Sequence, residues 1–138
     1  MFLNLLAPAQ QQLFIELARA VAEQDGIVAA TEQVLLDAVQ AECGVAELPA
    51  VRDLDAVLAD VPAAFDGEAT RSVLVLELAG VALIDGDAHP AELGIVAEVA
   101  ETVGMTPEKL RECVGFAERS RQLVMDGQLL LATADGVS

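Results

Sequence analysis

Apolar side chains recur at helical spacing along almost the whole chain. Leu13, Leu17 and Val21 follow one another at intervals of four residues, and Val96, Val99 and Val103 form a similar stripe in the second half. Such intervals place side chains on one face of an α-helix. No segment alternates apolar and polar residues over the length of a strand. The pattern therefore predicts an all-α fold.

Residues that begin or end helices stand at the edges of these stripes. Pro8, Pro90 and Pro107 suit the first turn of a helix, Thr106 suits an N-cap, and Gly44 suits a helix end. The expected helices lie near residues 8–24, 30–43, 53–60, 68–84, 90–103 and 107–125. From Gln128 on, Leu129–Leu131 could pack back on the bundle, while the following residues, ATADGVS, are expected to fray.

Two segments of the chain are alike at an offset of 60 residues. VAEQDGIVAATE at 21–32 aligns with VALIDGDAHPAE at 81–92, and Gly44 aligns with Gly104. The similarity is lost between residues 45 and 65, where Pro49 and Pro62 are expected to break the first copy. The alignment predicts one domain over 1–138, a compact bundle of about six or seven helices. Two diverged helix–loop–helix repeats, near 8–66 and 67–127, and a tail at 128–138 would compose it.

Charge narrows the range of partners. The chain has 23 acidic and seven basic residues and a net charge of −16. All of it lies in residues 1–108, because residues 109–138 hold four side chains of each sign. Such a chain cannot neutralise a run of phosphates, so we expect no nucleic-acid binding. A cation or a basic protein partner is the expected kind of ligand.

Membrane insertion and secretion are not expected. The longest apolar stretch, residues 72–84, has 13 residues and contains Glu77, which is too short and too polar for a membrane span. The N-terminus lacks the basic residues that open a signal peptide. The chain has two cysteines, Cys43 and Cys113, which are too few and too isolated for a disulfide framework. We expect both to be thiols in the apolar core. We therefore expect a soluble cytoplasmic protein.

One motif contains candidate ligand residues: Asp-Gly followed by five residues and Glu. It occurs at Asp25–Glu32 and again at Asp85–Glu92. It matches the back half of an EF-hand calcium loop, but Val21 and Val81 stand where the first carboxylate ligand should be, so a true EF-hand is rejected. Four carboxylates (Asp25, Glu32, Asp85 and Glu92) could nevertheless bind a divalent cation such as calcium or magnesium if both loops meet. Alternatively, Asp-Gly is only a turn and each Glu only complements a helix dipole.

The same pattern resembles a known family. VAEQDGIVAATEQVLLDAV and VALIDGDAHPAELGIVAEVAETVGM are similar to the acidic motifs of the TerB-like (tellurite-resistance) superfamily and of the N-terminal domain of membrane-anchored DnaJ-like co-chaperones. The resemblance covers roughly residues 10–125. It implies an all-α bundle that acts in stress response and binds metal through Asp25, Glu32, Asp85 and Glu92.

An enzyme is not expected. His89 is the only histidine, which leaves a catalytic triad or a zinc site short of ligands, and no nucleotide-binding glycine motif is present. Two functions stay open. One is a cation-responsive stress protein of the TerB-like kind. The other is an acidic adaptor for a basic or helical protein partner, in which both motifs are purely structural.

Overall fold

Every secondary-structure element that the computed structural model describes is a helix, as predicted. It describes residues 2–23, 30–44, 52–83 and 90–134. The elements are η1 (Leu3–Leu5), α1 (Pro8–Ala22), α2 (Ala30–Cys43), α3 (Leu54–Ala64), α4 (Glu68–Ala82), α5 (Pro90–Thr102) and α6 (Pro107–Ala134). None of these helices combines the length and the apolar character that crossing a membrane requires.

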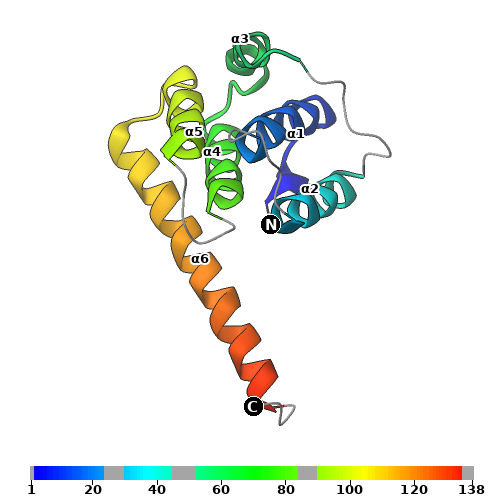
Figure 1. The fold of residues 1–138 in the computed structure, drawn as a ribbon. Coiled ribbons are helices and arrows are strands. Elements are labelled where there is room, and N and C mark those ends of the chain that lie inside the picture. Colours follow the sequence, from blue (N-terminus) through cyan, green and yellow to red (C-terminus); the bar gives the residue numbers. More distant parts are fainter. Residues whose placement is uncertain (1, 24–29, 45–51, 84–89, 135–138) are drawn as a thin grey trace.

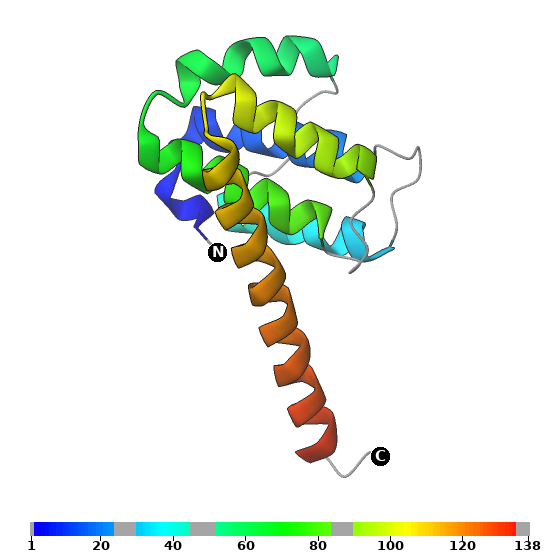
Figure 2. The ribbon, with the colours of Figure 1, turned by 90° about the vertical axis from the view of Figure 1, so that its left-hand side faces the viewer.

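Helices α1 and α4 form the centre of the bundle. Helix α1 packs against α2, α3, α4 and α5, and α4 also packs against α5 and α6 (Figures 1 and 2). Their facing side chains are fully buried: Phe14, Leu17, Val21, Leu74, Val75 and Leu78. Removing this apolar area from water is the main favourable contribution to the stability of such a fold.

The two helix pairs have matching bounds. Helices α1 and α4 start at residues 8 and 68 and have 15 residues each, and α2 and α5 start at residues 30 and 90. These starts differ by the offset of the sequence repeat. Two glycines with the same offset, Gly44 and Gly104, follow the second helix of each pair with φ of 69° and 76°. The left-handed backbone explains the glycine at both positions.

Helix α3 corrects the expectation that Pro62 breaks the chain into a loop. The helix continues through Pro62 to Ala64. Pro62 cannot donate the backbone hydrogen bond to the residue four positions earlier, and the burial of Val57, Leu58 and Val61 offsets this cost. Arg52, just before α3, also fastens the helix to the bundle. Its guanidinium donates to both carboxylate oxygens of Glu16 on α1, at 2.9 and 2.7 Å, and to Asp60 on α3 at 2.9 Å.

Helix α6 is longer than predicted and projects from the bundle. It was expected to end near residue 125, but it continues to Ala134 (Figures 1 and 2). Leu129, Leu130 and Leu131 are exposed, so they do not pack back on the bundle, which the sequence had left open. The helix continues because Gln, Leu and Ala, which favour helices, dominate after Gly127 and no proline follows.

The left-handed turn after α5 gives a stability test. Replacing Gly104 with Ala forces a Cβ into φ of 76° and should lower the free energy of unfolding by ~1–2 kcal/mol. Gly94→Ala is the control, because Gly94 is exposed inside α5 and a Cβ there meets nothing within 4 Å. That change should raise stability by ~0.5–1 kcal/mol. Urea unfolding followed by circular dichroism measures the stability of both variants. Equal effects of the two changes would contradict the left-handed turn at Gly104.

Candidate functional site

The structure describes one of the four predicted ligand side chains. Asp25 and Asp85 lie outside the described residues. Glu32 belongs to the first turn of α2, but its side chain also lies outside what is described. Glu92 lies in the first turn of α5, as predicted, and its side chain is described.

Glu92 is the exception in the apolar core. It is 6% exposed, and it is the one charged or polar residue that is buried in the described part of the chain. Glu92 also interacts with another group of the protein. A buried carboxylate is stable only when its charge is compensated, and the positive end of a helix contributes to that compensation. Glu92 is therefore held in a fixed place at the start of α5.

The two motif segments start and end on the same side of the bundle. Figure 2 shows that α1 and α4 end, and that α2 and α5 begin, at the right-hand side of the view. The chain therefore enters and leaves segments 24–29 and 84–89 on one side. Within the described ranges, no three His, Cys, Asp or Glu side chains gather in a group that could hold a metal ion. A site built by the motifs must take further ligands from the two segments.

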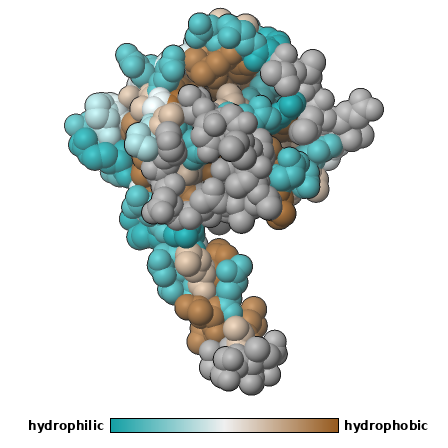
Figure 3. All heavy atoms as spheres, viewed as in Figure 1, coloured by the Kyte–Doolittle hydropathy of each residue, from teal (hydrophilic) through white to brown (hydrophobic). Residues whose placement is uncertain are grey.

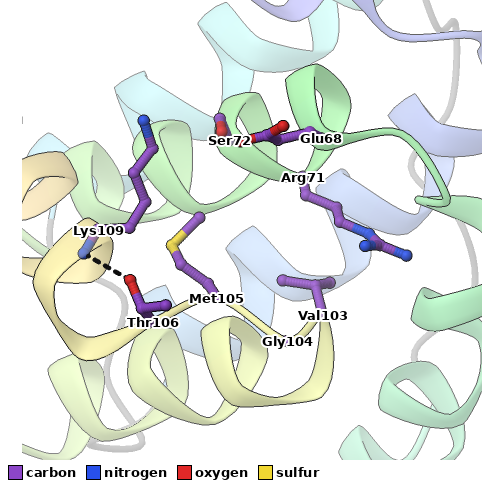
Figure 4. A pocket seen from close by; sticks show the side chains of 8 residues that line it. All are labelled: Glu68, Arg71, Ser72, Val103, Gly104, Met105, Thr106 and Lys109. Carbon is purple, nitrogen blue, oxygen red and sulfur yellow. Dashed lines mark hydrogen bonds between the residues drawn. The ribbon is translucent and has the colours of Figure 1, made fainter.

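A pocket of about 410 Å³ lies between the start of α4 and the turn that joins α5 to α6. Its polar side chains do not converge. Figure 4 shows the guanidinium of Arg71 and the ammonium of Lys109 pointing away from each other, with Met105 between them. Arg71 donates to the carbonyl oxygen of Phe65, and the hydroxyl of Thr106 accepts a hydrogen bond from the backbone N–H of Lys109 at 3.1 Å. The latter contact confirms Thr106 as the cap of α6. These groups stabilise the fold, and they do not form a set that surrounds a substrate.

A second hollow lies between α5 and α6. It has a volume of about 450 Å³ and is mainly apolar, with Leu93, Val96, Leu110 and Val114 in its lining. Arg111 and Glu118, both exposed, also line it. A hollow of this kind can accept an apolar side chain from another helix.

The apolar surface on the projecting part of α6 was missed by the sequence reasoning. Phe116, Leu123 and Leu130 recur at intervals of seven residues, which is the signal that could have revealed a continuous helix face. All three are exposed: Phe116 at 38%, and Leu123 and Leu130 at 72% each. The expected helix instead ended near residue 125, and Leu130 was expected in the tail at 128–138.

Comparison with known proteins gives no relative. Neither the models of protein families nor the curated proteins nor the solved structures include a match to this chain. The resemblance to the TerB-like superfamily therefore rests on the two motifs and their spacing alone.

The two thiols give a test of reactivity. Burial raises the pKa of both Cys43 and Cys113, and the nearby carboxylate of Glu42 raises that of Cys43 further. Since the thiolate is the reactive form, we expect slow alkylation at neutral pH and a rate that still rises above pH 9.0. Mass spectrometry after iodoacetamide treatment measures this, with urea-unfolded protein as the control. Rapid modification of either cysteine in the folded protein would contradict the expectation.

Proposed function

We propose that the protein is a non-enzymatic cytoplasmic domain of the TerB-like kind that acts in stress response. It binds a divalent cation, calcium or magnesium, through its paired motifs. Asp25 and Glu32 supply the carboxylates of the first motif, and Asp85 and Glu92 supply those of the second. Carboxylate oxygens are the ligands that these hard cations prefer.

The burial of Glu92 is the observation that carries this proposal. A glutamate at the start of a surface helix complements the dipole equally well when it is exposed. Here the carboxylate is instead enclosed, next to the segment that contains Asp85. Burial fixes the position of the oxygens before any cation arrives, so little side-chain freedom remains to be lost on binding.

The arrangement of the two helix pairs supports a shared site. Both motif segments begin after a 15-residue helix and end at the first turn of the next one, and both do so on the same side of the bundle (Figure 2). Two carboxylates from each motif would give four acidic ligands, and water and backbone carbonyls could complete the six to eight oxygens that calcium takes.

Thermal unfolding with single ions tests the proposal. A cation that binds the folded state should raise the midpoint, by the equivalent of ~2.7 kcal/mol at a hundredfold excess over its dissociation constant. Glu92→Gln should abolish the response to calcium or magnesium. Glu98→Gln is the matched control, because Glu98 lies on α5 but is exposed and outside the motif. Circular dichroism at 222 nm is a suitable probe, since the chain has no Trp or Tyr.

Two results would contradict the proposal. One is a midpoint that no divalent ion raises, and the other is an ion response that Glu92→Gln leaves unchanged. Asp85→Asn extends the test to the segment before Glu92. A loss of stability in both variants without any change in the ion response would make the motif a structural turn.

The second candidate is an acidic adaptor for a helical partner with basic residues. The hollow between α5 and α6 favours it, because apolar side chains at helical spacing line the hollow and a carboxylate, Glu118, lies beside them. The net charge of −16 would attract such a partner over a distance. Under this alternative the motifs contribute to stability only.

A further inference from the structure

Exposed apolar side chains concentrate on one helix of the described structure. Seven of the nine large hydrophobic residues that are exposed there belong to α6: Phe116, Leu123, Val124, Met125, Leu129, Leu130 and Leu131. Figure 3 shows apolar surface on the segment of α6 that projects below the bundle. Isolated exposed leucines are common on protein surfaces, but a grouped set marks an interaction site.

Five of these side chains share a face of the helix. At 100° per residue, Phe116, Leu123 and Leu130 lie in one row, and Val124 and Leu131 lie in the adjacent row. Ser120 and Gly127 lie between the rows. A Cβ added at Gly127 would meet nothing within 4 Å, so the space above it is open. We call these five large and two small residues the α6 face.

The α6 face adjoins the side that packs on the bundle and continues past the end of the bundle. Phe116 lies against Phe2, with ring centroids 6.3 Å apart, and remains 38% exposed. Cys113 and Ala117, which are buried, lie about a quarter of a turn from Phe116, on the same side of the helix as the row of Val124 and Leu131. Lys109 and Glu112, closer to the line of Phe116, are exposed. Val124 and Leu131, further along the helix, are exposed, so a second helix can lie along the projecting part of α6.

We propose that the α6 face binds the same face of a second copy of this chain, with the two α6 helices antiparallel. Arg119 and Asp126 both border the face on one side, seven residues apart. In an antiparallel pair each border faces the same border of the other helix, so Arg119 lies opposite Asp126 of the partner subunit. The twofold symmetry repeats this ion pair. In a parallel pair the border with Arg119 and Asp126 would face the opposite border of the partner's face. That opposite border carries Arg121 and Gln128 and no carboxylate, so Arg119 would find no acidic partner there.

Side-chain sizes fit the register that this ion pair sets. With Arg119 opposite Asp126 of the partner subunit, Ser120 lies opposite Leu123 of the partner subunit, and Gly127 lies opposite Phe116 of the partner subunit. Each small residue thus leaves space for a large one, as in the knobs-into-holes packing of paired helices. Because the pair is twofold symmetric, each of these two contacts occurs twice in the dimer.

The distribution of charge also favours antiparallel pairing. The net charge of −16 lies within residues 1–108, whereas the part of the chain from residue 109 is neutral. A parallel pair would bring two strongly acidic bundles to the same end and make them repel each other. An antiparallel pair directs the two bundles to opposite ends of the shared helices. A membrane surface is a poorer occupant, because acidic bundles next to anionic lipid would be repelled.

The mass of the full chain in solution tests the pairing. Size-exclusion chromatography with light scattering and refractive-index detection should give twice the chain mass of 14.4 kDa. Leu123→Glu should give a monomer that keeps its helical circular dichroism. Leu129→Glu is the control, since Leu129 has a similar exposure but lies on the opposite side of the helix, and it should remain a dimer.

Charge exchange tests the orientation. Arg119→Asp and Asp126→Arg each place like charges opposite each other, so each should weaken dimerisation by about tenfold or less, as expected for exposed ion pairs. The double variant should recover the affinity of the unchanged chain. In a parallel dimer the two positions do not meet, and the double variant would show no recovery.

Three outcomes would overturn the proposal. The first is an unchanged chain that is monomeric at all concentrations up to ~1 mM. The second is a dimer that Leu123→Glu leaves intact, and the third is a double charge variant no tighter than the single ones. A monomer that sediments with phosphatidylserine vesicles would instead assign the α6 face to lipid.

Discussion

The packing of α1 against α4 is the interaction on which the rest of the structure depends. Both helices have completely buried apolar side chains, Leu17 and Val21 on α1 and Leu74 and Leu78 on α4. Every other described helix contacts at least one of these two helices. Because the interior of the bundle is filled from these two helices, their relative position sets where α2 and α5 begin. The packing of α1 against α4 therefore determines where the chain enters and leaves the segments that carry the acidic motifs.

Helix α6 shows how one helix can serve two purposes. Its first half contributes Cys113 and Ala117 to the bundle, and its second half extends beyond the other helices with its apolar side chains exposed. The core can therefore tolerate changes in the projecting half, since no buried contact of the bundle requires Leu123 or Leu130. The two halves also differ from the rest of the chain in charge, because the acidic excess ends before α6.

Most of the fold followed from the sequence, and the exceptions have physical reasons. The prolines at residues 8, 90 and 107 and the glycines at residues 44 and 104 marked helix ends correctly because each has a strong backbone preference. Pro62 misled because the burial of Leu58 and Val61 offsets the backbone hydrogen bond that a proline cannot make. The burial of Glu92 could not be derived, because spacing places a residue in a helical turn but does not say which elements cover it. The position of Asp25 relative to Asp85 depends in the same way on loop conformation, which no periodicity specifies.

The equal lengths of α1 and α4 restrict how this protein can evolve. Inserting one residue into either helix would rotate everything after it by about 100° and move it by ~1.5 Å along the axis. The following helix would then start in a different direction from its counterpart, and Glu92 or Glu32 would point elsewhere. Insertions and deletions within either 15-residue helix should consequently be selected against.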